Sequence, residues 1–232
     1  MKIEVQADAQ AVAARAAGLV AQHARAAVKA RGRFTFAVSG GHTPWVMMAA
    51  LAGEDVPWSD VHVLQVDERV APADSDQRNY KHLRQSLLTH VPLPPDHLHA
   101  MPVEASDLPA AAADYARTLE SLGGSPPVLD LIHLGLGPDG HTASLIPGDP
   151  VLEVSDAWVG LTGVYQGCHR MTVTYPVLDH ARCLLWLVAG AEKVDALSRL
   201  KRHDQTIPGG RVRRDNAIVV ADRAAAAGLG GD

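Results

Sequence analysis

The feature that most restricts the fold of this chain is a set of short, mostly apolar segments that lack regular polar alternation. The clearest is VLDLIHLGLG (128–137), and FTFAV (34–38) and VHVLQV (61–66) are expected to be strands of the same kind. A strand with one face in water alternates apolar and polar residues, whereas a parallel strand covered on both faces does not. These segments therefore predict a largely parallel sheet that is covered by helices on both sides.

Helical segments separate the predicted strands. Residues 8–31 are rich in alanine and carry apolar residues near helical spacing, which predicts a helix. Other expected helices are 43–51, 78–88, 107–122 and 191–200, and other expected strands are 97–101, 170–175, 183–190 and 217–222. The small-residue tail after 222 is expected to be unstructured. Alternating strands and helices predict an α/β fold with a doubly wound sheet. Because neither a repeat nor a linker is visible, we expect one domain over residues 1–232.

Composition excludes several classes of protein. The formal net charge of −5 argues against a nucleic-acid partner, which normally requires clustered lysine and arginine. The first ten residues lack the pattern of a signal peptide, and no apolar run approaches the roughly 20 residues of a membrane span. Two cysteines cannot form a disulfide framework. We therefore expect a cytoplasmic protein with no membrane partner, whose oligomeric state, monomer or small homo-oligomer, the sequence leaves open.

The loop SGGHTP (39–44) follows a predicted strand and opens a predicted helix. In an open α/β sheet, ligands bind beyond the carboxyl ends of the strands at a topological switch point. Gly40 and Gly41 let the backbone approach a ligand, the helix N-terminus offers unpaired N–H groups, and Ser39 and Thr43 add hydroxyls. Thr43 is also expected to cap the helix. The loop is thus a candidate phosphate site, and a plain turn that needs glycine is the alternative.

The loop GPDGH (137–141) gives the most specific indication of catalytic residues. Its glycines and proline predict a tight turn that places Asp139 and His141 at the edge of the sheet. Histidine accepts protons near neutral pH, with an unperturbed pKa of about 6.5. Either Asp139 or Asp67 is a candidate to orient the His141 ring. His133, inside the preceding strand, is expected to be a core residue with satisfied hydrogen bonds.

Three further segments supply candidate charges. DER (67–69) ends a predicted strand, and its ordinary interpretation is a solvated salt-bridge edge. Arg170 opens a predicted strand, and Lys193 lies near the start of a predicted helix. Arginine suits bidentate contact with a phosphate, and lysine supplies a point charge.

Metal and serine-nucleophile chemistry have little support. HLH (97–99) places two histidines on one strand face, but no third ligand is near in sequence and HExxH is absent. The nucleophile motif GxSxG is also missing, and Ser39 and Ser144 have no evident partner base. We expect no metal, no cofactor and attack by water.

Taken in order, these segments resemble the glucosamine-6-phosphate isomerase/6-phosphogluconolactonase family over nearly the whole chain. SGGHTP is similar to its SGG-x-TP loop, and DERVAPADSDQRNY to its DER-x-VP…N-[YW] segment. GLGPDGHTASLIPG resembles the signature G-x-G-x-DGH-x-ASLFPG, while RMTVTYPVLDHAR and GAEK resemble later phosphate-binding segments. Ile146 stands where phenylalanine is usual, Asp179 where asparagine is common, and His42 at a variable position. These departures bear on the shape of the pocket and not on the type of reaction.

The resemblance implies hydrolysis of 6-phosphogluconolactone to 6-phosphogluconate, in the oxidative pentose phosphate route, on a modified Rossmann fold. It implies that His141 activates water and that Asp139 holds the loop or the ring. Asp67 and Arg69 would line the sugar end, with Arg69 stabilising developing negative charge. The phosphate ligands it implies are Ser39, Gly40, Gly41, Thr43, Arg170 and Lys193.

The sequence also allows two alternative functions. The first is a glucosamine-6-phosphate isomerase/deaminase, whose loop reads DGHIAFNEP. That chemistry needs an added acid near the histidine, and this chain has Ile146 in place of the glutamate. The second is a non-catalytic sugar-phosphate-binding regulator. No DNA-binding segment or extra domain is visible, and the histidine and aspartates of the catalytic motif are retained.

Overall fold

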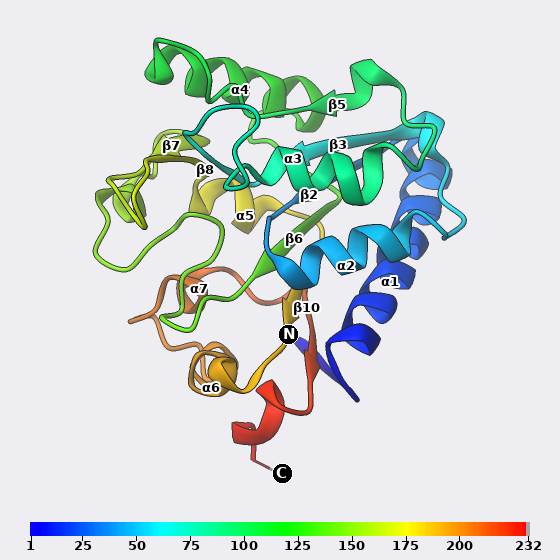
Figure 1. The fold of residues 1–232 in the computed structure, drawn as a ribbon, viewed down its shortest axis with the longest axis vertical. Coiled ribbons are helices and arrows are strands. Elements are labelled where there is room, and N and C mark those ends of the chain that lie inside the picture. The colour runs from blue at the N-terminus through cyan, green and yellow to red at the C-terminus, as the bar shows by residue number, and fades with distance from the viewer. Residues whose placement is uncertain (231–232) are drawn as a thin grey trace.

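The computed structural model describes residues 1–230 and has a parallel seven-stranded sheet at its centre (Figure 1). The strand order is β1-β10-β9-β6-β2-β3-β5, and each neighbouring pair in it is parallel. The strands are β1 (Lys2–Gln6), β2 (Phe34–Val38), β3 (Val61–Gln65), β5 (Leu98–His99), β6 (Leu131–Gly135), β9 (Leu184–Val188) and β10 (Ala217–Asp222). All five residues of β2 and of β9 are buried, as expected of parallel strands covered on both faces.

The strand order reverses between β2 and β6. From β2 the chain proceeds outward through β3 to β5, and it then returns to the other side of β2 as β6 before continuing to β9 and β10. The loops that follow β2 and β6 are SGGHTP and GPDGH. They therefore flank the switch point, where ligands of open α/β sheets bind.

Helices cover both faces of this sheet and form two hydrophobic cores. One core contains side chains of α1 (Ala9–Arg31), α2 (His42–Leu51), α3 (Asn79–Leu83) and its π-helical continuation η2 (Arg84–Leu88). The other contains side chains of α4 (Leu108–Gly123), α5 (Tyr175–His180) and α6 (Val194–Lys201). The prediction of a single α/β domain with helices on both faces is thus confirmed for the fold class. None of the described helices is both long and apolar enough to cross a membrane.

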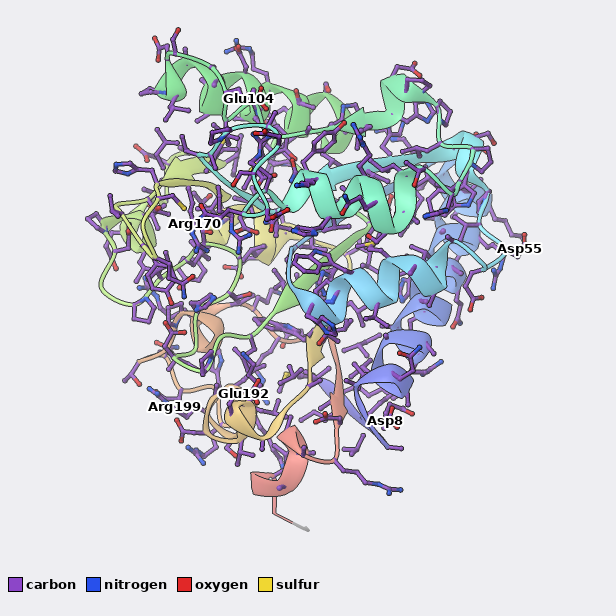
Figure 2. All side chains as sticks on the ribbon, viewed as in Figure 1. Asp8, Asp55, Glu104, Arg170, Glu192 and Arg199 are labelled. Carbon is purple, nitrogen blue, oxygen red and sulfur yellow. The ribbon has the colours of Figure 1, made fainter. Side chains whose placement is uncertain are left out.

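Local signals explain where the long helices begin and end. Asp8, at the start of α1 (Figure 2), accepts a hydrogen bond from the Ala11 N–H at 2.8 Å, and Gly32 ends the helix with a φ of 75°. Asp107 caps α4 in the same way, through the Ala110 N–H at 2.9 Å.

The protein has a second, smaller sheet of three antiparallel strands. Its order is β4-β8-β7, formed by β4 (Asp67–Arg69), β8 (Arg170–Val173) and β7 (Val159–Leu161). In its register Arg69 lies opposite Arg170. The expected strand at 170–175 is confirmed for residues 170–173, but the doubly wound sheet predicted from the sequence does not contain it, because β8 pairs with β4 and β7. The pairing places the DER segment beside Arg170.

Other expectations for local structure are also corrected. Thr43 does not cap α2, since Gly41 occupies the cap position and makes no side-chain cap hydrogen bond in the described structure of residues 1–230. The tail after 222 contains a 3-10 turn, η6 (Ala225–Gly228), in which Ala225 is fully buried and its N–H donates to Asp222 at 2.7 Å. The remaining short elements are η1 (Trp58–Asp60), η3 (Pro95–His97), η4 (Pro150–Glu153), η5 (Ala191–Lys193) and α7 (Pro208–Arg211).

Candidate active site

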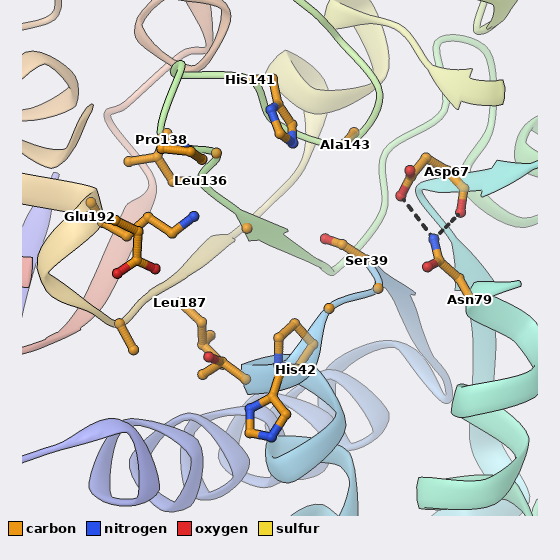
Figure 3. Close-up of a pocket in the computed structure, with 18 of the residues that line it drawn as sticks. Ser39, His42, Asp67, Asn79, Leu136, Pro138, His141, Ala143, Leu187 and Glu192 are labelled. Carbon is orange, nitrogen blue, oxygen red and sulfur yellow. Dashed lines mark hydrogen bonds between the residues drawn. The ribbon is translucent and has the colours of Figure 1, made fainter. Parts of the chain in front are cut away.

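A cleft of about 330 Å³ lies at the switch point of the sheet (Figure 3). Its volume is at the lower end of the range for small-molecule sites. Nine of the ten residues that we predicted to be functional line it, and the tenth, Asp139, contacts a lining residue. The lining residues are Ser39, Gly40, Gly41, His42, Thr43, Pro44, Asp67, Arg69, Asn79, Gly135, Leu136, Gly137, Pro138, His141, Ala143, Arg170, Leu187, Ala189, Glu192 and Lys193.

The GPDGH loop holds a hydrogen-bonded histidine–aspartate pair. His141 Nδ1 lies 2.6 Å from Asp139 Oδ1, and the same oxygen accepts the His141 backbone N–H at 3.2 Å. Burial raises the pKa of Asp139, but the charge and hydrogen bonds of His141 and a bond from Tyr165 outweigh it and lower that pKa overall. An ionised Asp139 therefore favours the tautomer with a proton on Nδ1, which leaves Nε2 to accept a proton. The sequence left Asp67 open as the partner of His141, and the structure assigns Asp139.

Glycine at 137 is required by the packing of this pair. A Cβ atom there would lie 2.1 Å from His141 Nδ1 and 2.6 Å from Asp139 Oδ1. Gly140 has a φ of 84° and a Cβ on it would lie 2.5 Å from Ile207 Cβ. The two glycines let the turn close tightly, so that the His141 ring folds back over its own loop.

The SGGHTP loop approaches the cleft through backbone atoms. Gly41 has a φ of 122° and precedes α2 without a side-chain cap, so the first N–H groups of this ten-residue helix are left for a ligand. A Cβ on Gly40 would lie 1.8 Å from Asn79 Oδ1, so the loop and Asn79 can pack together only with glycine there. The Ser39 hydroxyl donates to the His133 carbonyl at 2.8 Å and would have to rotate to donate to a ligand.

Asp67 and Arg69 face the cleft from β4 and are held by neighbours. Ser144 Oγ donates to Asp67 Oδ2 at 2.7 Å, and Asn79 Nδ2 donates to the Asp67 carbonyl at 3.1 Å. Arg69 Nη1 donates to Asn79 Oδ1 at 2.7 Å and to the Gln77 carbonyl at 2.7 Å. Asn79 thus contacts both residues, and these bonds hold Asp67 and Arg69 at the cleft.

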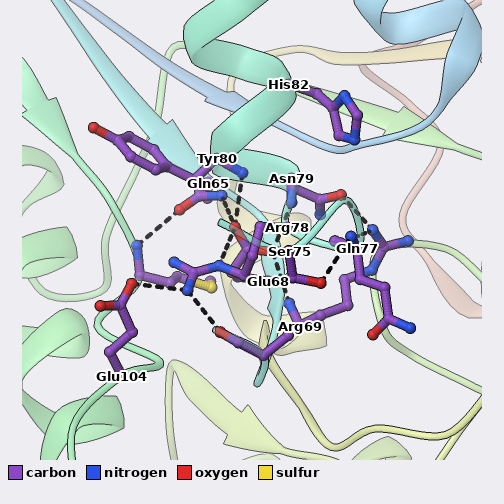
Figure 4. A network of polar contacts seen from close by, with 12 residues as sticks. Gln65, Glu68, Arg69, Ser75, Gln77, Arg78, Asn79, Tyr80, His82 and Glu104 are labelled. Carbon is purple, nitrogen blue, oxygen red and sulfur yellow. Dashed lines mark hydrogen bonds and ion pairs between the residues drawn. The ribbon is translucent and has the colours of Figure 1, made fainter. Parts of the chain in front are cut away.

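Glu68, between them, has a structural role (Figure 4). It is fully buried and accepts the backbone N–H groups of Arg69, Asn79 and Tyr80, each at 2.8 Å. Arg78 lies 3.3 Å from it as a buried ion-pair partner. The ordinary interpretation of DER as a solvated edge is therefore wrong. Glu68 connects β4 to the start of α3 through buried hydrogen bonds, and Asp67 and Arg69 line the cleft.

Arg170 and Lys193 bring positive charge from two other segments. Arg170 is 4% exposed, and its Nη2 donates to Gln166 Oε1 at 3.1 Å. Lys193 is half-buried and lies at the end of η5, next to the exposed Glu192. Both residues line the cleft, and Glu192 is seen there in Figure 3. The cleft therefore combines a helix N-terminus with cations from three separate segments.

His133 is a core residue, as expected, but its hydrogen bonding is incomplete. It is fully buried, its Nδ1 accepts the Ser39 N–H at 3.3 Å, and its Nε2 has no hydrogen-bond partner within residues 1–230. Burial lowers the pKa of His133 to about 3. This histidine is therefore neutral in the folded protein at every pH near neutrality.

We predict that this residue makes the protein sensitive to acid. Below pH of about 6.5 the unfolded chain protonates His133 while the folded chain does not, so the free energy of unfolding falls as the pH drops toward 3. The contribution is about 1.4 kcal/mol per pH unit. His133→Asn retains a hydrogen-bond acceptor and removes the titration. Urea unfolding between pH 6.5 and 5 should show a shallower pH slope for the variant, and equal slopes would contradict the prediction.

The sequence missed several residues that position the site. Asn79 lay within a segment whose family resemblance was visible, but its contacts with Asp67 and Arg69 were not predicted. Ser144 was considered only as a nucleophile, and it proves to be a partner of Asp67. Tyr165, whose hydroxyl donates to Asp139 Oδ2 at 3.3 Å, lies in a loop without a recognisable sequence motif.

The HLH histidines have a neighbour that the sequence did not suggest. His62 of β3 lies against both, with ring centroids 4.0 Å from His97 and 5.4 Å from His99. Burial, followed by the two neighbouring rings, lowers the pKa of His62 to about 4. Among residues 1–230, however, no group of three or more histidine, cysteine or acidic side chains has the arrangement of a metal site.

Comparison with known proteins identifies the family. The profile described as glucosamine-6-phosphate isomerases/6-phosphogluconolactonase matches residues 7–220. A 6-phosphogluconolactonase of Nostoc is 37% identical over 202 residues, which cover 85% of this chain and 84% of that protein. The 6-phosphogluconolactonase of Mycobacterium tuberculosis is 34% identical, and the match covers 98% of both chains.

Solved structures share the fold. A 6-phosphogluconolactonase from Thermotoga maritima superposes with a TM-score of 0.84 at 26% identity, covering 95% of this chain and 98% of that one. A monomeric glucosamine-6-phosphate deaminase has the same TM-score at 18% identity, covering 98% and 100%, which shows the common fold alone. With its profile, its relatives and its fold in agreement, this chain belongs to the glucosamine-6-phosphate isomerase/6-phosphogluconolactonase family.

Proposed function

We propose that this protein hydrolyses 6-phosphogluconolactone to 6-phosphogluconate, with His141 as the general base. The observation that carries the proposal is the His141–Asp139 pair, at 2.6 Å, in a cleft that also contains an uncapped helix N-terminus and several cations. Relatives that match most of the chain are 6-phosphogluconolactonases. A base beside an anion-binding cleft is what hydrolysis of a phosphorylated sugar ester requires.

Binding begins with the phosphate. The backbone of Gly40 and Gly41, the first turn of α2 with Ser39 and Thr43, and the charges of Arg170 and Lys193 hold the dianion. This anchoring fixes the sugar ring, so that binding energy far from the reacting carbon is used to orient it.

Hydrolysis then needs one proton transfer from water. His141 Nε2 removes a proton as the water oxygen attacks C1, while Asp139 stabilises the resulting imidazolium through Nδ1. Arg69 stabilises the negative charge on the carbonyl oxygen, and Asp67 lies beside it at the sugar end. The bond between C1 and the ring oxygen breaks. The ring oxygen takes up a proton to become a hydroxyl while the imidazolium gives up the proton that it gained, so His141 ends the cycle neutral and the open acid is released.

The direct test is the rate of acid release from freshly prepared 6-phosphogluconolactone. Because the lactone also hydrolyses without a catalyst, the spontaneous rate is subtracted at each pH. A rate proportional to the concentration of the protein supports the proposal. Binding of 6-phosphogluconate without turnover above the spontaneous rate would instead indicate a non-catalytic regulator.

Lys193→Ala is expected to raise KM for the phosphorylated lactone by about 10-fold or more with a smaller change in kcat, because a charge-assisted hydrogen bond contributes about 1.5–3 kcal/mol. The control Lys29→Ala removes an exposed lysine of α1 that is not among the lining residues, and it should leave KM unchanged. The non-phosphorylated lactone should be hydrolysed equally by wild type and Lys193→Ala. An unchanged KM for the phosphorylated substrate would refute the phosphate assignment.

The deaminase alternative is disfavoured by the residue at position 146. Proton transfer between C1 and C2 of a hexosamine phosphate needs an acid near the histidine, where this chain has Ile146, which is 6% exposed and apolar. Since the deaminase shares the fold, the fold itself does not separate the two activities. Release of ammonia from glucosamine 6-phosphate would reverse this conclusion.

We further expect the enzyme to act in the cytoplasm, without a nucleic-acid or membrane partner and without a cofactor, as a monomer or small homo-oligomer. The two cysteines are unpaired, and Cys183 is buried with its pKa raised by burial to about 11, as suits an unreactive core thiol.

A further inference from the structure

Tyr165 lies in a tight turn between β7 and β8 that reaches back to the His141 loop. The backbone N–H of Tyr165 donates to the Cys168 carbonyl at 3.0 Å, and the two central residues, Gln166 and Gly167, have φ values of 52° and 86°. Two residues of positive φ are typical of the two-residue turns that fit the twist of a hairpin. The turn fixes the direction of the half-buried Tyr165 side chain.

The Tyr165 hydroxyl completes the hydrogen bonding of Asp139. It donates to Oδ2 at 3.3 Å, while Oδ1 is taken by His141 Nδ1 at 2.6 Å. The rings of Tyr165 and His141 also meet edge-on, with centroids 5.8 Å apart and planes at 68°. Asp139 is therefore held from both sides, so that it cannot swing away from the imidazole without losing a second bond.

The face of the same ring contacts a different part of the cleft. The guanidinium carbon of Arg170 lies 5.0 Å from the centroid of the Tyr165 ring, within the range of a cation–π interaction. Arg170 is 4% exposed, its Nη2 donates to Gln166 of the same turn at 3.1 Å and its Nη1 to Ser144 Oγ at 3.5 Å, while its Nε has no partner among residues 1–230. The bond to Ser144 is long and the bond to Gln166 comes from the same turn, so the Tyr165 ring and its turn provide much of the support of this buried guanidinium.

We propose that Tyr165 is a positioning residue that acts on both halves of the site: its hydroxyl orients the Asp139–His141 pair, and its ring holds Arg170 where the substrate anion binds. This inference rests on the proposed function. Tyr165 is not among the residues that line the cleft, so it acts through these two neighbours and not by contact with the substrate.

Two substitutions separate the two effects. Tyr165→Phe removes the hydroxyl and keeps the ring, so we expect kcat to fall about 10-fold while KM stays within about twofold of wild type. Tyr165→Ala removes both, so kcat should fall by at least as much and KM should rise about fivefold. The dissociation constant of 6-phosphogluconate, measured by calorimetry, should follow the same division: unchanged in Tyr165→Phe and weaker in Tyr165→Ala.

The control is Val164→Ala, which alters the neighbouring residue, 66% exposed, and should leave both constants unchanged. Wild-type kcat in Tyr165→Phe, or equal KM values for Tyr165→Phe and Tyr165→Ala, would overturn the inference. So would a loss in Val164→Ala as large as that in Tyr165→Phe, because the turn as a whole would then be responsible. These outcomes are distinct from failure of the proposed function, which would be shown by a wild-type protein that does not hydrolyse the lactone.

Discussion

His141→Asn is expected to lower kcat for 6-phosphogluconolactone at least 100-fold while the protein stays folded. A positioned general base contributes about 10²–10⁴-fold, and asparagine cannot accept a proton from water at neutral pH. The side chain is partly exposed and its one fixed side-chain bond is to Asp139, so its loss should change the melting temperature little. KM should change by a small factor, since the residues proposed to bind the phosphate are untouched. The measurement is steady-state acid release, corrected for the spontaneous rate.

His42 provides a matched control for this variant. It is a second histidine of the same cleft (Figure 3), it is exposed, and no carboxylate in the described part of the chain is bonded to its ring. His42→Asn should therefore keep kcat within a few-fold of wild type. If His42→Asn abolished activity and His141→Asn retained it, the base would be His42 and the mechanism proposed above would be wrong.

The main sheet could be predicted because burial leaves a simple pattern in sequence. FTFAV (34–38) is confirmed residue for residue as β2, since five buried residues followed by Ser-Gly-Gly have few other interpretations. β1 was missed because it lies at the sheet edge, where Val5 is 50% exposed and the pattern is weak. β7 was missed because it has only three residues.

The second sheet could not be predicted, because an apolar segment does not specify its partner. RMTV has the composition of any buried strand, and its pairing with β4 depends on how the chain between them is folded. That pairing determines the site, since it sets Arg69 opposite Arg170. The expected strand is therefore confirmed for residues 170–173, whereas the second sheet that it joins was not predicted.

The site, like the fold, could be predicted only in part. Carboxyl ends of parallel strands meet at one edge, so the sequence alone predicts that SGGHTP and GPDGH lie together. Contacts between residues far apart in sequence could not be predicted: Ser144 bonds to Asp67 across 77 residues, and Tyr165 to Asp139 across 26. These contacts depend on the small sheet and on the turn beside it, neither of which has a sequence motif.

Gly137→Ala is expected to lower kcat about 100-fold or more, although the substituted residue carries no chemistry. The added Cβ would lie 2.1 Å from His141 Nδ1 and 2.3 Å from its Cε1, so the imidazole must move by about an ångström or more. A displacement of about 1 Å can reduce catalysis about 10²-fold. The backbone of Gly137 is not in the left-handed region, so alanine adds a steric contact and not a strained conformation.

Gly135→Ala is the comparison that isolates this contact. Gly135 ends β6 only two residues earlier, and a Cβ on it would have no atom of the described residues within 4 Å. Its effect on kcat should be below tenfold, whereas Gly137→Ala should approach the activity of His141→Asn with a similar melting temperature. Equal activities for the two glycine variants would mean that the His141 ring tolerates displacement. In that case the hydrogen bond to Asp139 would not be the contact that sets the rate, and the base would have to act from a different position of the ring.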